Sequence, residues 1–110
     1  MVQEEKSAGA VIFYTDKENR PKFLLLKYTN YWGFMKGNIE ENENIEETMA
    51  REMKEETNIT KFKIIQGFNY NQAWFYKLNN ILRRKYATYF LVEISKQEAG
   101  KVILRKLEIN

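Results

Sequence analysis

Three glutamates stand at a spacing that brings their carboxylates to one side of a helix. Glu52, Glu55 and Glu56 are three and four residues apart, and such residues are neighbours on a helical surface. Three like charges at one patch raise each other's pKa values unless a divalent cation lies among them. The spacing therefore indicates a metal site. The alternative is a solvated helix face, in which ion pairs of Arg51 with Glu47 and Glu55 account for part of the pattern.

The composition limits the other chemistry that is open to this chain. It has 110 residues, a formal net charge of +3, no cysteine and no histidine. Disulfides, thiolate or histidine zinc sites and nucleophile–histidine triads are therefore excluded. Catalysis must depend on carboxylates, lysine, tyrosine, hydroxyls or a metal held by oxygen. With 44% hydrophobic residues, we expect one folded domain over residues 1–110.

Neither the N-terminus nor any later segment indicates a membrane protein. The stretch "MVQEEKSAG" is charged and lacks the apolar run of a signal peptide. No apolar run approaches the roughly 20 residues that span a bilayer. We therefore expect a cytoplasmic protein without membrane contact.

The segment around the glutamates carries signals for both ends of a helix. Asn44 is a favourable N-cap, and Glu47 three residues later completes a capping box. Asn58 suits the left-handed position that follows a helix. These signals predict a helix over Ile45–Thr57. Ile45, Met49 and Met53 form its apolar stripe, and Glu56 lies at the edge of that stripe.

Strand-like segments lie on both sides of this helix. Residues 8–15 and 22–28 predict a hairpin, residues 61–70 a strand after the helix, and residues 71–95 two strands around the "KLNN" turn. The tail offers a last alternating segment, with Leu107 and Ile109 on one side. Strands around one helix predict an α+β domain.

The loop and helix together resemble the Nudix box, G-x5-E-x7-R-E-U-x-E-E-x-G-U, in which U is apolar. The residues that match it are Gly37, Glu43, Arg51, Glu52, Met53, Glu55, Glu56 and Ile59. Asn58 replaces the second glycine, a change that suits a left-handed helix end and involves no catalytic group. The segments "SAGAVIFY", "KFLLLKY", "YWGFMKGNIE" and "IIQGF" are similar to diadenosine tetraphosphate hydrolases of that superfamily.

The resemblance covers roughly residues 8–95 and implies a fold, an activity and a metal. The fold is an α/β/α sandwich with a mixed curved sheet. Family members continue through another strand and a C-terminal helix, so we expect that helix to be missing or truncated here. The reaction is hydrolysis of a nucleoside diphosphate linked to another group, and it requires Mg²⁺, with Mn²⁺ as a substitute.

The resemblance also implies roles for residues of the box. The implied metal ligands are Glu52, Glu55, Glu56 and the backbone carbonyl of Lys36, with one glutamate also a candidate base. Arg51 would orient the carboxylates through an ion pair. Glu43 would support the geometry of the loop and helix, and Gly37 would let the backbone approach a ligand closely.

Substrate contacts are expected outside the box. The stretch "NQAWFYKLNNILRRKY" interleaves aromatic residues, which can stack on a base, with basic residues, which can bind phosphates. A hairpin that buries an aromatic face and protects its edge with charges shows the same pattern. By the resemblance, Lys85 is the best phosphate contact and Tyr76 or Trp74 the best stacking residue, with Arg84 a further candidate.

Two aromatic residues closer to the box receive a different interpretation. Tyr31 and Trp32 lie in the loop that precedes Gly37. We expect them to pack that loop, with substrate binding as the weaker alternative.

The leading function is the asymmetric hydrolysis of diadenosine tetraphosphate to ATP and AMP. One alternative is removal of pyrophosphate from triphosphorylated RNA 5′ ends, since the chain is basic. Nucleotide-pool cleansing is a second alternative. A nucleotide-binding sensor with a weak site is a third. The partner in every case is a nucleotide or an RNA end.

Overall fold

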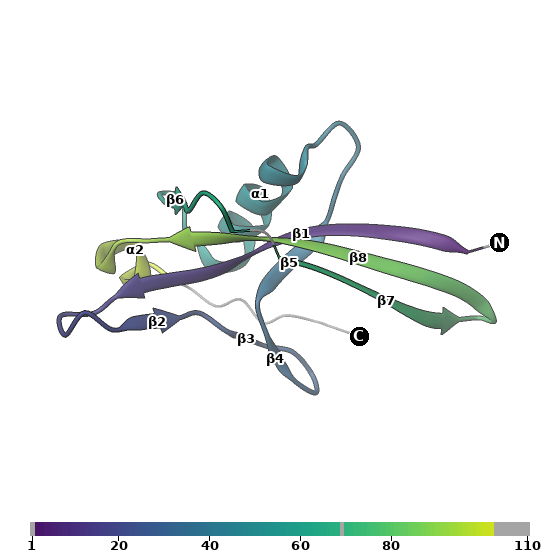
Figure 1. Ribbon diagram of the computed structural model, residues 1–110, viewed down its shortest axis with the longest axis horizontal. Coiled ribbons are helices and arrows are strands. Elements are labelled where there is room, and N and C mark those ends of the chain that lie inside the picture. The colour runs from purple at the N-terminus through teal and green to yellow at the C-terminus, as the bar shows by residue number, and fades with distance from the viewer. Residues whose placement is uncertain (1, 69, 103–110) are drawn as a thin grey trace.

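Two long strands form the centre of a mixed six-stranded sheet in the computed structural model, which describes residues 2–68 and 70–102 (Figure 1). They are β1 (Gln3–Thr15) and β8 (Ile81–Glu93), which pair in parallel along eleven positions. Antiparallel partners flank them: β2 (Pro21–Phe23) and β5 (Met35–Asn38) beside β1, and β6 (Lys63–Ile64) and β7 (Tyr70–Leu78) beside β8. A separate small sheet pairs β3 (Leu26–Lys27) with β4 (Trp32–Gly33). The predicted α+β class and mixed sheet are thus confirmed.

Helix α1 (Ile45–Thr57) has the predicted bounds and the predicted ends. The Glu47 amide donates to the Asn44 side chain over 2.8 Å, and the Asn44 amide donates to the Glu47 carboxylate over 3.0 Å. This reciprocal pair is the capping box. Asn58 adopts a left-handed conformation with φ 67° and so ends the helix.

The core lies between α1 and the sheet. Met49 and Met53 are fully buried against Ala8 and Met35 of strands β1 and β5. The prediction that Ile45 shares this packed face is wrong, because its side chain is 42% exposed. Ile45 is the first residue of the helix and lies over an open groove.

Two predicted strands are shorter than expected. The turn after β1 forms around the Asp16 carboxylate, which accepts hydrogen bonds from the amides of Glu18 and Arg20. The returning chain pairs with β1 only over Pro21–Phe23 and then leaves to form β3. Of residues 61–68, only Lys63–Ile64 are in a strand.

The predicted hairpin of β7 and β8 turns at Asn79 and Asn80. Both residues have positive φ, 53° and 63°, a conformation that asparagine tolerates and that suits a two-residue hairpin turn. The outer parts of β7, β8 and β1 project past α1 as three strands (Figure 1). We call residues 3–6, 73–78 and 81–86 the ribbon.

After the sheet, the described chain forms one short helix, α2 (Lys96–Gly100), whose N-cap Ser95 accepts a hydrogen bond from the Glu98 amide. Leu107 and Ile109 of the predicted tail segment lie outside the described residues. No helix within residues 2–68 and 70–102 is long and apolar enough to cross a membrane.

Candidate active site

Gly37 of β5 lies directly against Glu52 of α1. A Cβ atom at position 37 would come within 2.0 Å of Glu52 Cδ and 2.2 Å of its Oε1. Only glycine therefore lets this carboxylate approach the backbone of β5 so closely. The carbonyl of Lys36, predicted as a metal ligand, immediately precedes Gly37 in the same strand.

Arg51 connects the loop before α1 with the glutamates on the helix. Its Nε and Nη2 donate to the two carboxylate oxygens of Glu43 over 2.7 and 3.1 Å. Its Nη1 donates to Glu52 over 2.9 Å and to Glu55 over 3.3 Å. Nη2 also donates to the Asn38 carbonyl over 3.1 Å. The guanidinium thus orients two of the three proposed metal ligands.

Glu43 is bound on all sides by the protein. Besides Arg51, the Thr48 hydroxyl donates to it over 2.8 Å and the Glu40 amide over 3.0 Å. The hydrogen bond from Arg51 is the main reason why the pKa of Glu43 falls to about 2. These hydrogen bonds occupy both carboxylate oxygens of Glu43. Glu43 therefore holds the loop against the helix and has little capacity left to coordinate a metal.

Glu56 shows the opposite situation. Its Oε2 is buried and has no hydrogen-bond partner within the described part of the chain. The pKa of Glu56 is raised to about 7, chiefly by burial and then by the neighbouring charge of Glu52, whereas Lys36 opposes the shift. An orphaned buried carboxylate beside a second carboxylate is unfavourable in free energy unless a cation or a proton joins them.

Glu52, Glu55 and Glu56 offer the oxygen ligands that a divalent cation needs, but their carboxylates do not converge on a common point in this structure. Among the described residues, no three acidic side chains stand close enough to hold a metal ion. Arg51 draws Glu52 and Glu55 toward itself. The Glu55 side chain is 55% exposed and is held by one contact of 3.3 Å, so little opposes its turning toward Glu56. Hard oxygen donors of this kind are the ligands that Mg²⁺ prefers.

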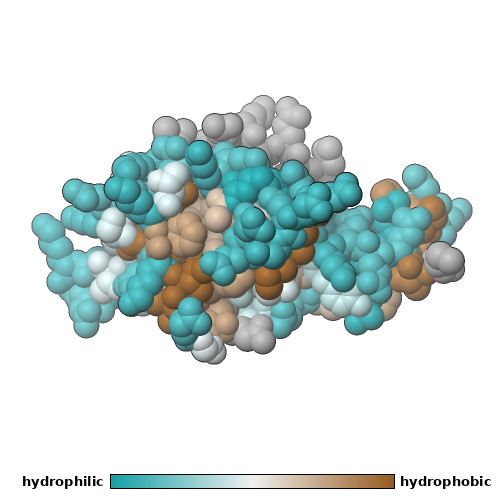
Figure 2. Space-filling view, turned by 90° about the horizontal axis from the view of Figure 1, so that it is seen from above, coloured by the Kyte–Doolittle hydropathy of each residue, from teal (hydrophilic) through white to brown (hydrophobic). Residues whose placement is uncertain are grey.

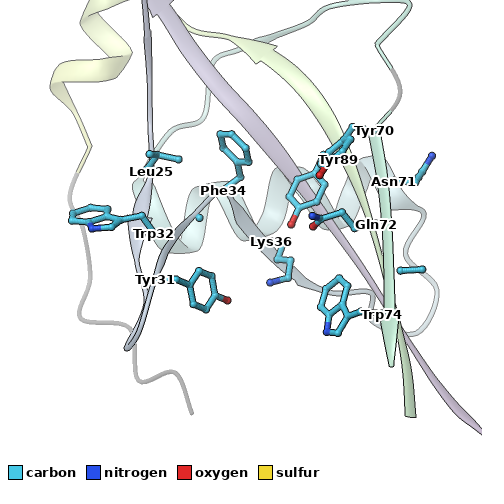
Figure 3. Close-up of a pocket in the computed structure, with 12 residues that line it drawn as sticks. Leu25, Tyr31, Trp32, Phe34, Lys36, Tyr70, Asn71, Gln72, Trp74 and Tyr89 are labelled. Carbon is cyan, nitrogen blue, oxygen red and sulfur yellow. The ribbon is translucent and has the colours of Figure 1, made fainter. Parts of the chain in front are cut away.

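A cavity of about 900 Å³ lies on the face of the sheet opposite α1 (Figure 3). Figure 3 shows Lys36 in the middle of it, with the β3–β4 region on one side and strands β7 and β8 on the other. The aromatic residues that line it are Tyr31, Trp32, Phe34, Tyr70, Trp74 and Tyr89. A concave, largely aromatic surface around one cation is typical of a site for a flat anionic ligand.

Lys36 joins this cavity to the glutamates. Its Nζ lies 5.6 Å from the ring centroid of Tyr28 and 5.8 Å from that of Trp74. Burial lowers the pKa of Lys36, the charge of Lys85 lowers it further, and that of Glu56 opposes both. The amine therefore lies within electrostatic reach of both the proposed metal ligands and the ribbon.

Lys85, Tyr76 and Trp74 share the cavity side of the ribbon. The register places Trp74 beside Lys85, and Lys85 beside Glu5. Lys85 Nζ lies 3.8 Å from Glu5 Oε2, and the Tyr76 hydroxyl donates to Glu5 Oε1 over 2.5 Å. Trp74 lines the cavity itself, whereas Lys85, opposite it on β8, and Tyr76, two residues further along β7, do not. The structure thus brings together three of the four predicted substrate residues.

Arg84 lies on the other side of the ribbon. Its guanidinium lies over the rings of Tyr86, at 4.5 Å, and Phe75, at 5.5 Å. Successive strand residues point to opposite faces, so Arg84 lies on the side of the sheet opposite Lys85 and the cavity. The sequence pattern could not show which of Arg84 and Lys85 lies on the cavity side, because alternation along a strand does not tell which face of the sheet carries the cavity.

Tyr31 packs on Tyr28 and Trp32 lies beside Lys27 within their loop, as expected, but both also line the cavity, which the sequence did not indicate. Their side chains are 53% and 60% exposed and line the cavity. Tyr31 stacks on Tyr28 with ring centroids 4.9 Å apart. The Lys36 side chain was also missed, since only its carbonyl was considered. The available signal was the concentration of aromatic residues immediately before the box, at residues 28–34.

Fold and site together define the class of protein. The NUDIX domain family matches residues 5–106, and the chain belongs to this family. It is a hydrolase that acts on phosphoanhydride bonds. The resemblance inferred from the sequence is thus confirmed.

Individual solved structures refine this comparison. The Ap4A (diadenosine tetraphosphate) hydrolase of C. elegans is similar at 29% identity with a TM-score of 0.71, and its binary complex at 28% with 0.75. Each match covers 96% of this chain and 76% of that chain. The E. coli dihydroneopterin triphosphate pyrophosphohydrolase shares the fold at 19% identity, with a TM-score of 0.65 and coverage of 96% and 78%. No curated protein matches the sequence at a significant level.

Proposed function

We propose that this chain hydrolyses diadenosine tetraphosphate to ATP and AMP with the help of Mg²⁺. The observation that carries the proposal is the placement of Lys36 between a patch of carboxylates and an aromatic cavity. The similarity to the C. elegans Ap4A hydrolase supports the choice of substrate.

Glu52, Glu55 and Glu56 would hold the cation together with the Lys36 carbonyl. When bound, the cation offsets negative charge on the phosphate oxygens. Arg51 keeps Glu52 oriented through the hydrogen bond of 2.9 Å. Without metal the pKa of Glu56 is raised to about 7, and its Oε2 has no hydrogen-bond partner among the described residues, so Glu56 would be the group that takes a proton from the attacking water.

The cavity would hold one base of the substrate. Its volume of about 900 Å³ leaves room for a nucleoside between Tyr31 and Trp74. Stacking on such rings contributes about 1–3 kcal/mol per base. The Lys36 amine would bind the phosphate nearest the glutamates, and Lys85 would bind phosphates further along the ribbon.

Product analysis tests the substrate. With Mg²⁺ present, we expect diadenosine tetraphosphate to yield equal amounts of ATP and AMP, and no ADP. Triphosphorylated RNA and single nucleoside triphosphates, assayed under the same conditions, provide the comparison. Faster hydrolysis of the RNA would favour the pyrophosphohydrolase alternative, and binding without turnover would favour the sensor.

Thermal unfolding tests the metal separately. A ligand that binds only the folded state raises its stability. We therefore expect millimolar Mg²⁺ or Mn²⁺ to raise the melting temperature of the wild-type chain and to have little effect on Glu56→Gln. An unchanged melting temperature for the wild type would contradict a metal site at these glutamates.

A further inference from the structure

The side of the ribbon that faces α1 carries apolar and basic residues that the proposed function does not use. Phe75 and Leu82 are 58% and 37% exposed. Leu82 lies two residues before Arg84 on β8, and Phe75 pairs with Arg84, so all three share one side of the strands. We call Phe75, Leu82, Arg84 and Tyr86 the bare face. Figure 2, which looks onto the α1 side, shows hydrophobic side chains at the outer end of the ribbon.

Arg84 is the basic residue of the bare face, and its charge is poorly satisfied by the described part of the chain. It is held over Tyr86 and Phe75, and its Nε is buried without a hydrogen-bond partner among the described residues. No carboxylate of residues 2–68 and 70–102 lies within 4.0 Å of the Arg84 guanidinium. A charge that is desolvated on one side by aromatic rings gains more than an exposed one from an external anion.

The neighbouring start of α1 is complementary. Ile45 is 42% exposed and, with Ile39 and Tyr86, lines an open groove of about 330 Å³ between the helix and the ribbon. Glu46, the next residue of the helix, is exposed, and so is Glu41 in the loop before it. One side of the molecule therefore carries an apolar, acidic helix start next to a ribbon that is apolar at Phe75 and Leu82. The charged residues on that side of the ribbon are net positive: Glu4, Lys6, Lys77 and Arg84.

We propose that this side is the interface of a symmetric dimer, in which the helix start of each copy lies on the bare face of the other. A two-fold axis makes every such contact twice, so one pair of complementary surfaces suffices. The helix is roughly 10 Å across and stands above the sheet, while the ribbon beside it is uncovered. In the proposed dimer, the helix start of one copy lies over the part of the ribbon that α1 does not cover in the other copy.

The charges favour a second copy over other occupants. Glu46 of one copy would face Arg84 of the other, and Ile45 would face Phe75 and Leu82. A nucleic acid or an anionic membrane would meet Arg84 but would also be repelled by Glu41 and Glu46. A second copy matches both halves of the surface at once.

Sedimentation equilibrium of the full chain over a range of concentrations tests the proposal. We expect a monomer–dimer equilibrium whose Kd rises at least tenfold in Leu82→Gln and in Ile45→Gln. Lys17→Gln, which changes an exposed residue of the β1–β2 turn, is the matched control and should leave Kd unchanged. Circular dichroism confirms that each variant is folded.

A charge exchange makes the test specific for the proposed contact. Glu46→Lys and Arg84→Glu should each weaken the dimer, and the double variant should recover at least half of the lost affinity, measured as log Kd. A monomer at all concentrations would overturn the proposal. A dimer that is unaffected by Leu82→Gln and Ile45→Gln would overturn it equally, as would binding of a monomer to anionic vesicles or RNA through Leu82.

Discussion

The glutamate helix with its loop and the ribbon are both rich in charged residues, yet they are organised over very different distances along the chain. Arg51 meets Glu43 eight residues away and Glu52 beside it. In the ribbon, Glu5 meets Tyr76 and Arg83, which are 71 and 78 residues away. Contacts of the first kind are local, between a helix and the loop that directly precedes it, whereas those of the second kind require the strand register. The helix was accordingly predicted in detail and the ribbon only in outline.

The largest effect is expected on the helix, for Glu56→Gln. The change keeps the shape of the side chain and removes a charge from the proposed metal ligand whose Oε2 has no protein partner. We expect kcat to fall by about 100-fold or more, on the scale of several kcal/mol for metal-borne charge stabilisation. Activity at saturating Mg²⁺ measures it. Wild-type activity would show that the glutamates are a solvated face after all.

Gly37→Ala tests how tightly the loop and the helix are joined. The new Cβ would overlap the Glu52 carboxylate, 2.0 Å from Cδ, and force it away. We expect roughly 10-fold lower kcat/KM and a loss of about 1–3 kcal/mol in unfolding free energy. Gly100→Ala is the matched control, since its Cβ would meet no atom within 4 Å. Similar losses in both variants would contradict the close approach at Gly37.

Lys85→Ala and Arg84→Ala compare the two sides of the ribbon directly. Lys85 shares its side with Trp74, so its removal should raise KM by about tenfold with kcat little changed. Arg84 lies on the other side and should leave KM near the wild-type value. Steady-state kinetics of both variants decide the point. A change confined to kcat in Lys85→Ala, or equal effects of both variants, would remove Lys85 from substrate binding.

The pH dependence of stability without metal isolates Glu56 from the rest of the helix. Its pKa is about 7 in the folded chain, against an ordinary value of 4.5. The folded state therefore binds the proton more tightly, and this contribution to stability is complete below pH 4.5 and is lost as the pH rises through 7. We expect the melting temperature in EDTA to fall by a few degrees between pH 5 and 8 from this group alone. Glu56→Gln should flatten the decline, and an identical decline in both proteins would contradict the assignment.

The smallest effect is expected for Glu47→Gln, at the start of the same helix. The amide oxygen still accepts the hydrogen bond from the Asn44 amide, and only the favourable charge near the helix N-terminus is lost. We expect at most about 1 kcal/mol less stability and nearly unchanged activity. Chemical denaturation and an activity assay measure both. A rate loss close to that of Glu56→Gln would show that the glutamates are not divided into capping and catalytic groups.

The details that could be predicted from the sequence are those formed by residues close together in the chain. Asn44 and Glu47 are three residues apart, so the sequence alone specifies the capping box. Asn79 and Asn80 indicated the hairpin turn in the same way. Ile45 shows the limit of such patterns, because the periodic stripe predicts a face of the helix but not where the sheet beneath it ends.

The sequence by itself determined the helix, its two ends, the order of the carboxylates along it and the family to which the chain belongs. The helix, its ends and its carboxylates depend on residues a few positions apart, where the geometry of a helix leaves little choice. The family follows from the spacing of the box over residues 37–59. Only the tertiary structure decided that Arg84 faces away from Lys85, that Tyr31 and Trp32 line a cavity, and that the Lys36 amine joins this cavity to Glu56. These facts depend on strand register and on segments brought together from distant parts of the chain, and no short-range pattern encodes either.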